Sequence, residues 1–193
     1  KPSSMGDVIH TLPVAHAIKR NYPGSRIGWV IQSGLESFLE NDPSIDEIFR
    51  ISIPSTSDPH APRGAYLKAS VATIKELFRL RKLFQLHPYD IILDLHASFR
   101  SALISFTNPD CRRYGLEDAK ELNTYFQDEL IRLDMQKPHA VDKNLASLSI
   151  FGVQPTSADF QIYLSQPVRD KAEQFLAGLQ LPPGKKLIYA NPA

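Results

Sequence analysis

Several features are scarce in this chain, and each scarcity excludes a class of protein. Cys111 is the only cysteine among 193 residues, so no disulfide can form within the chain, which fits a reducing compartment. No apolar run approaches the ~18 residues that a membrane-spanning helix needs. The net charge is only +1, so no overall field favours nucleic acid as a partner. With 42% apolar and 22% charged residues, the composition is that of an ordinary globular protein.

Signatures of metal and nucleotide chemistry are also lacking. The six histidines show no metal-ligand spacing, and there is no Cys/His cluster. The dinucleotide fingerprint, the P-loop, the nucleophile elbow and the kinase signature are all missing from the sequence. We therefore predict neither a metal site nor a familiar cofactor motif.

Two kinds of periodicity alternate along the chain. Short apolar runs predict strands at 26–31, 47–52, 89–95, 112–116 and 185–191, while 158–164 fits either a strand or an extended segment. Amphipathic or capped segments predict helices at 34–41, 68–86, 97–106, 141–152 and 166–179. Alternation with short connections predicts an α/β fold with a parallel sheet covered by helices on both faces.

Two of the predicted helices raise particular expectations. The first is expected from Asp7 to Tyr22, and Pro13 inside it either kinks the helix or marks a later start near Thr11. The helix at 68–86 is expected to gather its apolar residues on one face, with a solvated basic face largely opposite. That apolar set comprises Val71, Ile74, Leu77, Phe78, Leu80 and Phe84.

The loop "PSSMGD" precedes the first helix and carries small polar residues. Ser3, Ser4 and the backbone amides up to Asp7 would face an anion at a helix N-terminus, and Gly6 permits close approach of a ligand to the backbone. The purely structural alternative is that a serine caps the helix while Asp7 complements its dipole. The residue types alone favour neither interpretation.

A second polar loop, "DLHASFRS", follows the most convincing central strand. Ligands of open parallel sheets bind outside the carboxyl ends of the strands, so Arg100 and Ser101 at the next helix start are candidates for anion contacts. A solvated surface position for Arg100 is the alternative. We expect both loops to lie on one rim, approached by Lys120 and His139 from later loops.

The segment "KPSSMGDVIHTLP", residues 1–13, resembles the opening motif of the heptosyltransferase family of glycosyltransferases, position by position. Further segments resemble the same family: "YDIILDLHASFRSAL", "RYGLEDAKEL", "KPHAVDKNLASLSIFGV" and the closing "LIYANPA". The resemblance runs from end to end of the chain but corresponds to the first half of a family member.

The resemblance implies a fold and a domain division. It implies the N-terminal, acceptor-side Rossmann-like domain of a GT-B enzyme over residues 1–184, with its first strand missing in front of Lys1. Residues 185–193 would begin the C-terminal nucleotide-sugar domain. On this interpretation the 193 residues alone are expected to be inactive.

The resemblance also implies a reaction and its residues. Heptose would pass from ADP-heptose to a lipopolysaccharide core acceptor with inversion, without metal or cofactor, because helix N-termini and basic side chains can stabilise a diphosphate. Asp7 would be the catalytic base. The implied acceptor-side residues are Ser3, Ser4, Gly6, Arg100, Ser101, Lys120 and His139, and Asn191 would contact the donor. Partners would be the nucleotide sugar and a glycolipid, in the cytoplasm, with peripheral contact to the inner membrane.

The chain departs from the family pattern at two places. Lys120 stands in "AKE", where the family has arginine, and lysine cannot form the forked contact with a carboxylate. The loop before the helix at 68–86 carries only Arg63 and Lys68 as cations. The acceptor is thus left open. Two other functions stay open as well: another two-domain sugar-nucleotide enzyme such as an epimerase, and a non-catalytic anion-binding module.

Overall fold

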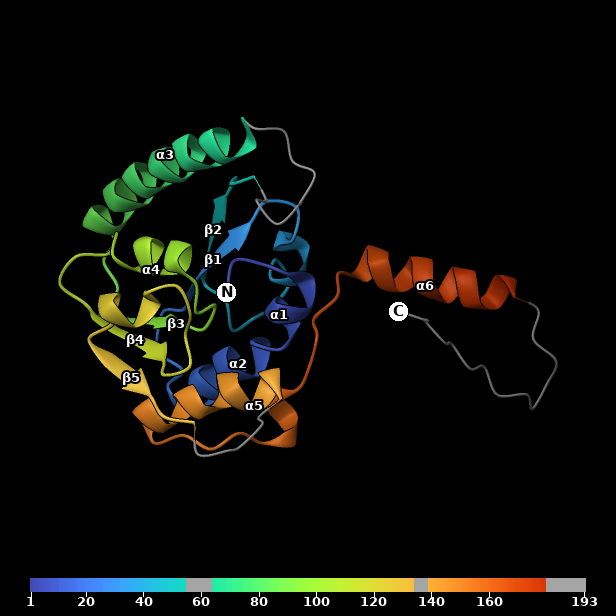
Figure 1. Cartoon of the computed structure of the whole chain (residues 1–193). Helices are drawn as coiled ribbons and strands as arrows, with labels where there is room; N and C mark the ends of the chain where they lie inside the picture. The colour runs from blue at the N-terminus through green and yellow to red at the C-terminus, as the bar shows by residue number, and fades with distance from the viewer. Residues whose placement is uncertain (55–63, 134–138, 180–193) are drawn as a thin grey trace.

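Helices and parallel strands alternate along the chain, as Figure 1 shows for the computed structural model of the protein. The structure describes residues 1–54, 64–133 and 139–179. The α-helices are α1 (Met5–Ile9), α2 (Leu12–Asn21), α3 (Ala65–Leu86), α4 (Phe99–Ser105), α5 (Ala140–Leu145) and α6 (Gln166–Gly178). The strands are β1 (Gly28–Gln32), β2 (Glu47–Ile51), β3 (Ile91–Asp94), β4 (Arg112–Leu116) and β5 (Glu129–Ile131). The short 3₁₀ helices are η1 (Glu36–Phe38), η2 (Asn123–Phe126), η3 (Ala146–Phe151) and η4 (Ser157–Asp159).

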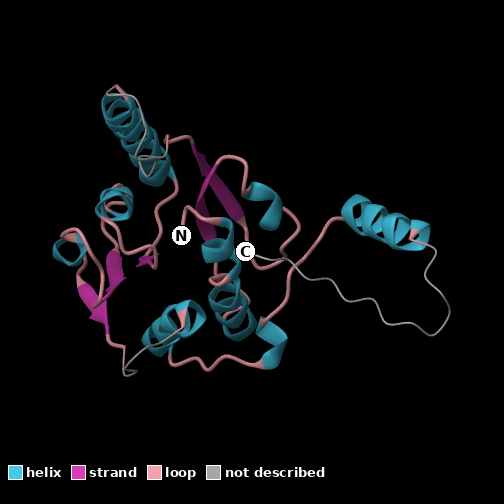
Figure 2. Cartoon of the chain, turned by 45° about the vertical axis from the view of Figure 1, so that its right-hand side comes forward, coloured by secondary structure: helices cyan, strands magenta, loops and turns pink. Residues whose placement is uncertain are grey.

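The strands of the described residues form two parallel sheets. One has the order β1-β2 and the other β3-β4-β5, and every pair is parallel, as the sequence predicts. The N-terminal end of the chain lies between the two sheets (Figures 1 and 2). Gln32 N, at the end of β1, donates to Pro2 O at 2.8 Å, and Trp29 Nε1 donates to Lys1 O at 2.9 Å. These bonds fix residues 1–7, the segment called the Asp7 loop below, beside the carboxyl end of β1.

Helices cover both faces of the β1-β2 sheet, because side chains alternate along β1. Trp29 and Ile31 pack with α1, α2 and η1 on one face. Val30, between them in sequence, packs with Leu80 and Phe84 of α3 on the other face. The predicted two-sided α/β arrangement is therefore confirmed.

Helix α2 connects the cores of the two sheets. Leu12 and Ala15 pack against β1, whereas Val14 and Ala17 pack against Tyr114 and other side chains of the second sheet. Because these residues are all buried, α2 holds the two sheets in a fixed relation. The loop in front of it is held with it.

The segment from Asp7 to Tyr22 is not one continuous helix. The chain forms α1 and then a separate α2, in which Pro13 is the second residue, so the later-start alternative is confirmed. Thr11 lies at the junction and its Oγ1 donates to Asp7 O at 2.8 Å. This bond helps to complete the C-terminal end of α1.

The expectation of a single apolar face on α3 is wrong. Leu80 and Phe84 are buried, but Val71, Ile74 and Phe78 are 45%, 53% and 69% exposed. At about 100° per residue, positions 71, 74 and 78 lie on the side of the helix opposite to 80 and 84. Apolar residues on α3 thus form two ridges, and only one of them contacts the core.

Other expectations fall partly outside the described residues. Helix α6 forms as predicted, with Pro167 in its first turn, and all its side chains are exposed. The segment 158–164 contains η4 and no strand, so the extended alternative holds. The predicted strand at 185–191 and the domain boundary after residue 184 lie outside the described residues. No helix within the described ranges is long and apolar enough to cross a bilayer.

A buried histidine ties α2 to the turn at η4. His16 is 6% exposed, and its Nε2 lies 2.7 Å from Asp42 Oδ2 while its Nδ1 lies 2.6 Å from Asp159 O. Both partners are acceptors, so both ring nitrogens must donate and the ring is an imidazolium. Burial lowers the pKa of His16, but the hydrogen bonds to Asp42 and to the Asp159 carbonyl outweigh burial, and the net pKa is raised.

The charge of His16 makes stability depend on pH. The pKa of His16 is raised in the folded protein. The stabilisation that the charged ring gives the folded state is therefore complete below the unfolded pKa of ~6.5, and it is lost as pH rises through the folded pKa. We expect the difference in free energy of unfolding between wild type and His16→Gln to shrink as pH rises. Urea unfolding at a series of pH values measures this. The exposed His87→Gln is the control, and a pH-independent difference for His16→Gln would contradict the imidazolium.

Candidate active site

Asp7 occupies the first turn of α1 and makes three hydrogen bonds there. Ser4, which precedes the helix in an extended conformation, donates from N and Oγ to Asp7 Oδ2 at 3.0 and 3.1 Å. Lys1 Nζ donates to Asp7 Oδ1 at 3.0 Å. Asp7 therefore stabilises the helix start, as the structural interpretation predicts. Its side chain is also 35% exposed, so its carboxylate is open to a ligand.

The surroundings of Asp7 keep its carboxylate ionised. Partial burial by itself raises the pKa of Asp7, but the hydrogen bonds from Lys1 and from the Ser4 backbone outweigh it, and the net pKa is lowered. An ionised carboxylate can accept a proton or a hydrogen bond, although a low pKa makes it a weak base. Chemistry at Asp7 therefore depends on where the carboxylate is held.

The loop after β3 is folded around a buried carboxylate, that of Asp94, which is 5% exposed. Its Oδ1 accepts from the backbone N–H of His96 at 3.1 Å and of Ala97 at 3.3 Å. Its Oδ2 accepts from Ser101 Oγ at 2.8 Å and from Asn123 Nδ2 at 2.6 Å. These four donors come from β3–α4, from α4 itself and from η2, so one carboxylate joins three elements.

Gly115 in β4 makes room for the donors of this network. A Cβ at this position would lie 2.5 Å from Gln127 Cγ and 3.4 Å from Asn123 Oδ1. Gln127 Nε2 in turn donates to Asn123 Oδ1 at 3.2 Å, which orients the Asn123 amide so that its NH₂ faces Asp94. The glycine is thus required by close packing rather than by its backbone angles.

The pKa of His96, in the β3–α4 loop, depends on charges near Asp7. Its side chain is half-buried, and burial is the main cause of its lowered pKa. The charges of Lys1 and Asp7 also act on the pKa of His96, so this ring and the Asp7 carboxylate share one electrostatic environment. The β3–α4 loop therefore lies within electrostatic range of the Asp7 carboxylate, and a shared rim stays a prediction.

The loop after β4 joins the same rim. Lys120 N donates to Ala97 O at 3.2 Å, and Phe99 N donates to Glu121 Oε2 at 3.2 Å. Glu121 and Leu122 have positive φ values of 56° and 64°, which turn the chain sharply into η2. The Lys120 side chain is exposed, and its backbone is bonded to the β3–α4 loop.

His139 approaches the opposite end of α1. It precedes α5, and its ring lies edge-on to that of His10, with 5.3 Å between the ring centroids. Asn144 of α5 donates to His10 O at 3.1 Å and to Thr11 Oγ1 at 2.9 Å. Helix α5 is therefore fixed to the end of α1, and His139 borders the Asp7 loop through His10.

The remaining predicted residues differ in what they offer a ligand. Ser3 is half-buried and Ser4 exposed, and a Cβ at Gly6 would meet nothing within 4 Å, so the approach to this backbone is open. Arg100 is half-buried in the first turn of α4. Ser101 is 6% exposed and its hydroxyl donates to Asp94, so it supports the loop from inside.

Asn191, the expected donor contact, lies outside the described residues. Within 1–54, 64–133 and 139–179, no group of three or more His, Cys, Asp or Glu side chains could hold a metal ion.

Sequence reasoning missed the residues that support this rim. Asp94, Asn123, Gln127 and His10 carry it, and none belongs to the predicted site residues. A carboxylate inside the apolar run "YDIILDL" is the one available signal, because a buried charge requires several donors. Nothing in the spacing of Asn123 and Gln127 identifies them as those donors.

Replacing Gly115 by alanine tests the packing of the network. The new methyl group would displace Gln127 and tilt the Asn123 amide away from Asp94, at a cost of about 1–3 kcal/mol in unfolding free energy. Gly24→Ala is the matched control, because a Cβ there would meet nothing within 4 Å. Urea unfolding of both variants measures the effect. Equal stabilities of the two variants would show that the network tolerates displacement.

Comparison with known proteins relates this geometry to one family. The family model of glycosyltransferase family 9 (heptosyltransferase) matches residues 77–193. Lipopolysaccharide heptosyltransferase 1 of Escherichia coli (strain K12) is 25% identical over 197 residues, which cover 99% of this chain and 56% of that protein. Lipopolysaccharide core heptosyltransferase OpsX of Haemophilus influenzae is 23% identical, with 90% of this chain and 45% of that protein covered.

Solved structures show the same fold. The family 9 glycosyl transferase from Veillonella parvula DSM 2008 aligns with a TM-score of 0.71 and 22% identity, over 95% of this chain and 49% of that one. The E. coli heptosyltransferase WaaC with ADP-2-deoxy-2-fluoro heptose aligns with a TM-score of 0.63 and 23% identity, over 95% and 54%. This chain spans about half the length of the relatives it matches.

Proposed function

The chain belongs to glycosyltransferase family 9, the heptosyltransferase family, and from this membership we propose that it forms the acceptor-side half of an enzyme. That enzyme transfers heptose from ADP-heptose to a lipopolysaccharide core acceptor. The transfer inverts the anomeric centre and uses neither metal nor cofactor. The proposed setting is the cytoplasmic face of the inner membrane, where the enzyme meets a glycolipid.

The partly exposed carboxylate of Asp7, which its hydrogen bonds keep ionised, is the observation that carries this proposal. It is held by Lys1 and Ser4, so its orientation is set before a substrate arrives. A base that needs no rearrangement lowers the entropy loss of the reaction. The purely structural role of Asp7 is compatible with this use, since the same bonds that stabilise α1 aim the carboxylate.

The proposed step moves one proton and exchanges one bond at the sugar. The acceptor oxygen forms a bond to the anomeric carbon while the bond from that carbon to the diphosphate oxygen breaks. The hydroxyl proton passes to an Asp7 oxygen, and ADP leaves with the bonding electron pair. The hydroxyl becomes acidic only as its new bond forms, so a weak base suffices in a good position.

Other residues of the rim fit the acceptor. Lys120 is exposed beside the β3–α4 loop, and Arg100 lies at the start of α4, so both supply positive charge for an acidic or phosphorylated sugar. Gly6 leaves open space for a sugar against the backbone. We assign Asn191 to the donor side on the family motif alone.

Replacing Asp7 by asparagine tests the catalytic role. Asn cannot take the proton, so we expect kcat of the full-length enzyme to fall by roughly 10²–10⁴ while affinity for ADP-heptose hardly changes. Loss of the helix-start bonds should also lower stability by about 0.5–2 kcal/mol. Single-turnover rates and melting curves of the same preparation separate the two effects.

Asp142→Asn provides a matched control. Asp142 stabilises the start of α5 in the same way, with His139 N donating to its Oδ2 at 3.2 Å. The control should lose comparable stability and retain turnover. A stable Asp7→Asn enzyme with near-native turnover would refute the catalytic assignment of Asp7 and leave it the structural role at the helix start.

Arg100 is tested through its effect on the two substrates. We expect Arg100→Ala to raise the acceptor KM more than the donor KM, because α4 borders the rim that carries Asp7. Arg100→Lys should recover part of the loss, since it keeps the charge but not the forked geometry. Steady-state kinetics with each substrate varied in turn gives both constants. An unchanged acceptor KM would place Arg100 on the solvated surface.

A further inference from the structure

We propose that α3 carries a membrane-binding face, on which an apolar ridge enters the interface of an anionic lipid bilayer. The ridge consists of Leu67, Val71, Ile74 and Phe78. Basic side chains beside it would contact lipid phosphates. This inference rests on the proposed function, because an enzyme acting on a glycolipid must meet that lipid at a bilayer.

The ridge is apolar, continuous and open to solvent. Its four side chains are 70%, 45%, 53% and 69% exposed in chain order. Their spacings of four, three and four residues place them within roughly 60° around the helix axis. The residues that bury α3 against the core, such as Leu80 and Phe84, lie on the opposite side. A long helix with a second apolar ridge facing water is typical of an interfacial helix.

The charge around the ridge has one sign. Arg81 borders it on one side, and Lys82, Lys75 and Lys68 border it on the other, all four exposed. Glu76, the one acidic residue of α3, lies at the side of the buried face and pairs with Arg79 at 2.6 Å. Each cation near an anionic lipid surface adds to binding, so the face matches phosphate headgroups.

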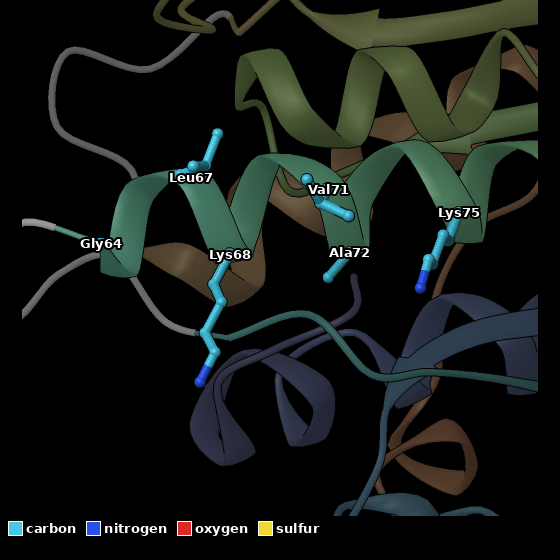
Figure 3. Close-up of a pocket in the computed structure, with 6 residues that line it drawn as sticks. All are labelled: Gly64, Leu67, Lys68, Val71, Ala72 and Lys75. Carbon is cyan, nitrogen blue, oxygen red and sulfur yellow. The ribbon is translucent and has the colours of Figure 1, made fainter.

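The N-terminal half of this face is hollowed. A groove of ≈ 410 Å³ is lined by Leu67, Lys68, Val71 and Lys75 among other residues of α3. In Figure 3, Lys68 and Lys75 extend from the same side of the helix. Helix α3 follows β2, whose last residue, Ile51, pairs in register with Gln32 of β1. Gln32 N donates to Pro2 O, so the end of β2 and the segment before Asp7 lie at the same edge of the sheet.

Exposure alone does not single out α3, because α6 also has exposed apolar side chains. Phe175 and Leu176 are 68% and 47% exposed. In α6, however, Arg169 and Lys171 are balanced by Asp170 and Glu173, so that helix offers no charge complementarity to an anionic surface. A second copy of this chain fits α3 less well, because a symmetric pairing would place its cations against one another.

Vesicle binding of the full-length protein tests the proposal. Vesicles of phosphatidylcholine with phosphatidylglycerol are compared with phosphatidylcholine alone, by co-sedimentation at low and high salt. We expect binding to the anionic vesicles only, weakened by salt. Ile74→Ser with Phe78→Ser, and separately Lys75→Gln with Lys82→Gln, should each lower the affinity about tenfold or more. Phe175→Ser with Leu176→Ser on α6 is the matched control and should bind as wild type does.

Three results would overturn the inference: equal binding to both vesicle types, unchanged binding of the α3 variants, or an α3-dependent dimer that ignores vesicles. A transfer assay separates this inference from the proposed function. The α3 variants should keep kcat/KM on a delipidated, water-soluble acceptor. They should lose activity on the corresponding acceptor that keeps its lipid and is embedded in vesicles. If no acceptor is glycosylated by wild type, the proposed function fails, and vesicle binding still decides the role of α3.

Discussion

The geometry of the candidate site depends on the buried carboxylate of Asp94. A charge this deeply buried is tolerated only when donors surround it, and here those donors fix the β3–α4 loop, the start of α4 and η2 at once. Once the loop is fixed, Ala97 O receives Lys120 N, and the later loop follows. The loops of the rim are therefore positioned by one charge, and that charge is itself buried.

Asp7, unlike Asp94, is held by local hydrogen bonds. Its three hydrogen bonds come from within six residues of the chain, so its position depends on local structure rather than on the sheet. Contacts between distant parts of the chain hold the segments next to Asp7. Pro2 O accepts from Gln32 N of β1, and Asn144 of α5 donates to Thr11 Oγ1 after α1. A carboxylate that is fixed locally, on a helix that is fixed globally, is well suited to act on a substrate without rearrangement.

Much of the fold could be predicted because its signals are periodic and local. The strand at β3 and the helix at α6 follow from apolar runs and from Pro167, and Pro13 indicated the break before α2. The two ridges of α3 could not be separated, since periodicity does not reveal which apolar stripe meets the core. At the site, the short motif around Asp7 indicated its helix-start position. The roles of Asn123 and Gln127 depend on contacts across 22 to 33 residues, which no spacing rule reports.

The isolation of α6 has a consequence for the chain's dynamics. A helix of 13 residues without a buried side chain is close to the length at which helix and coil have similar free energies in water. Its backbone amides should therefore exchange with solvent deuterium orders of magnitude faster than those of α2, although both are drawn as regular helices. Any surface that covers Phe175 and Leu176 would shift that helix–coil equilibrium, so the folding of α6 and its docking are a single thermodynamic event.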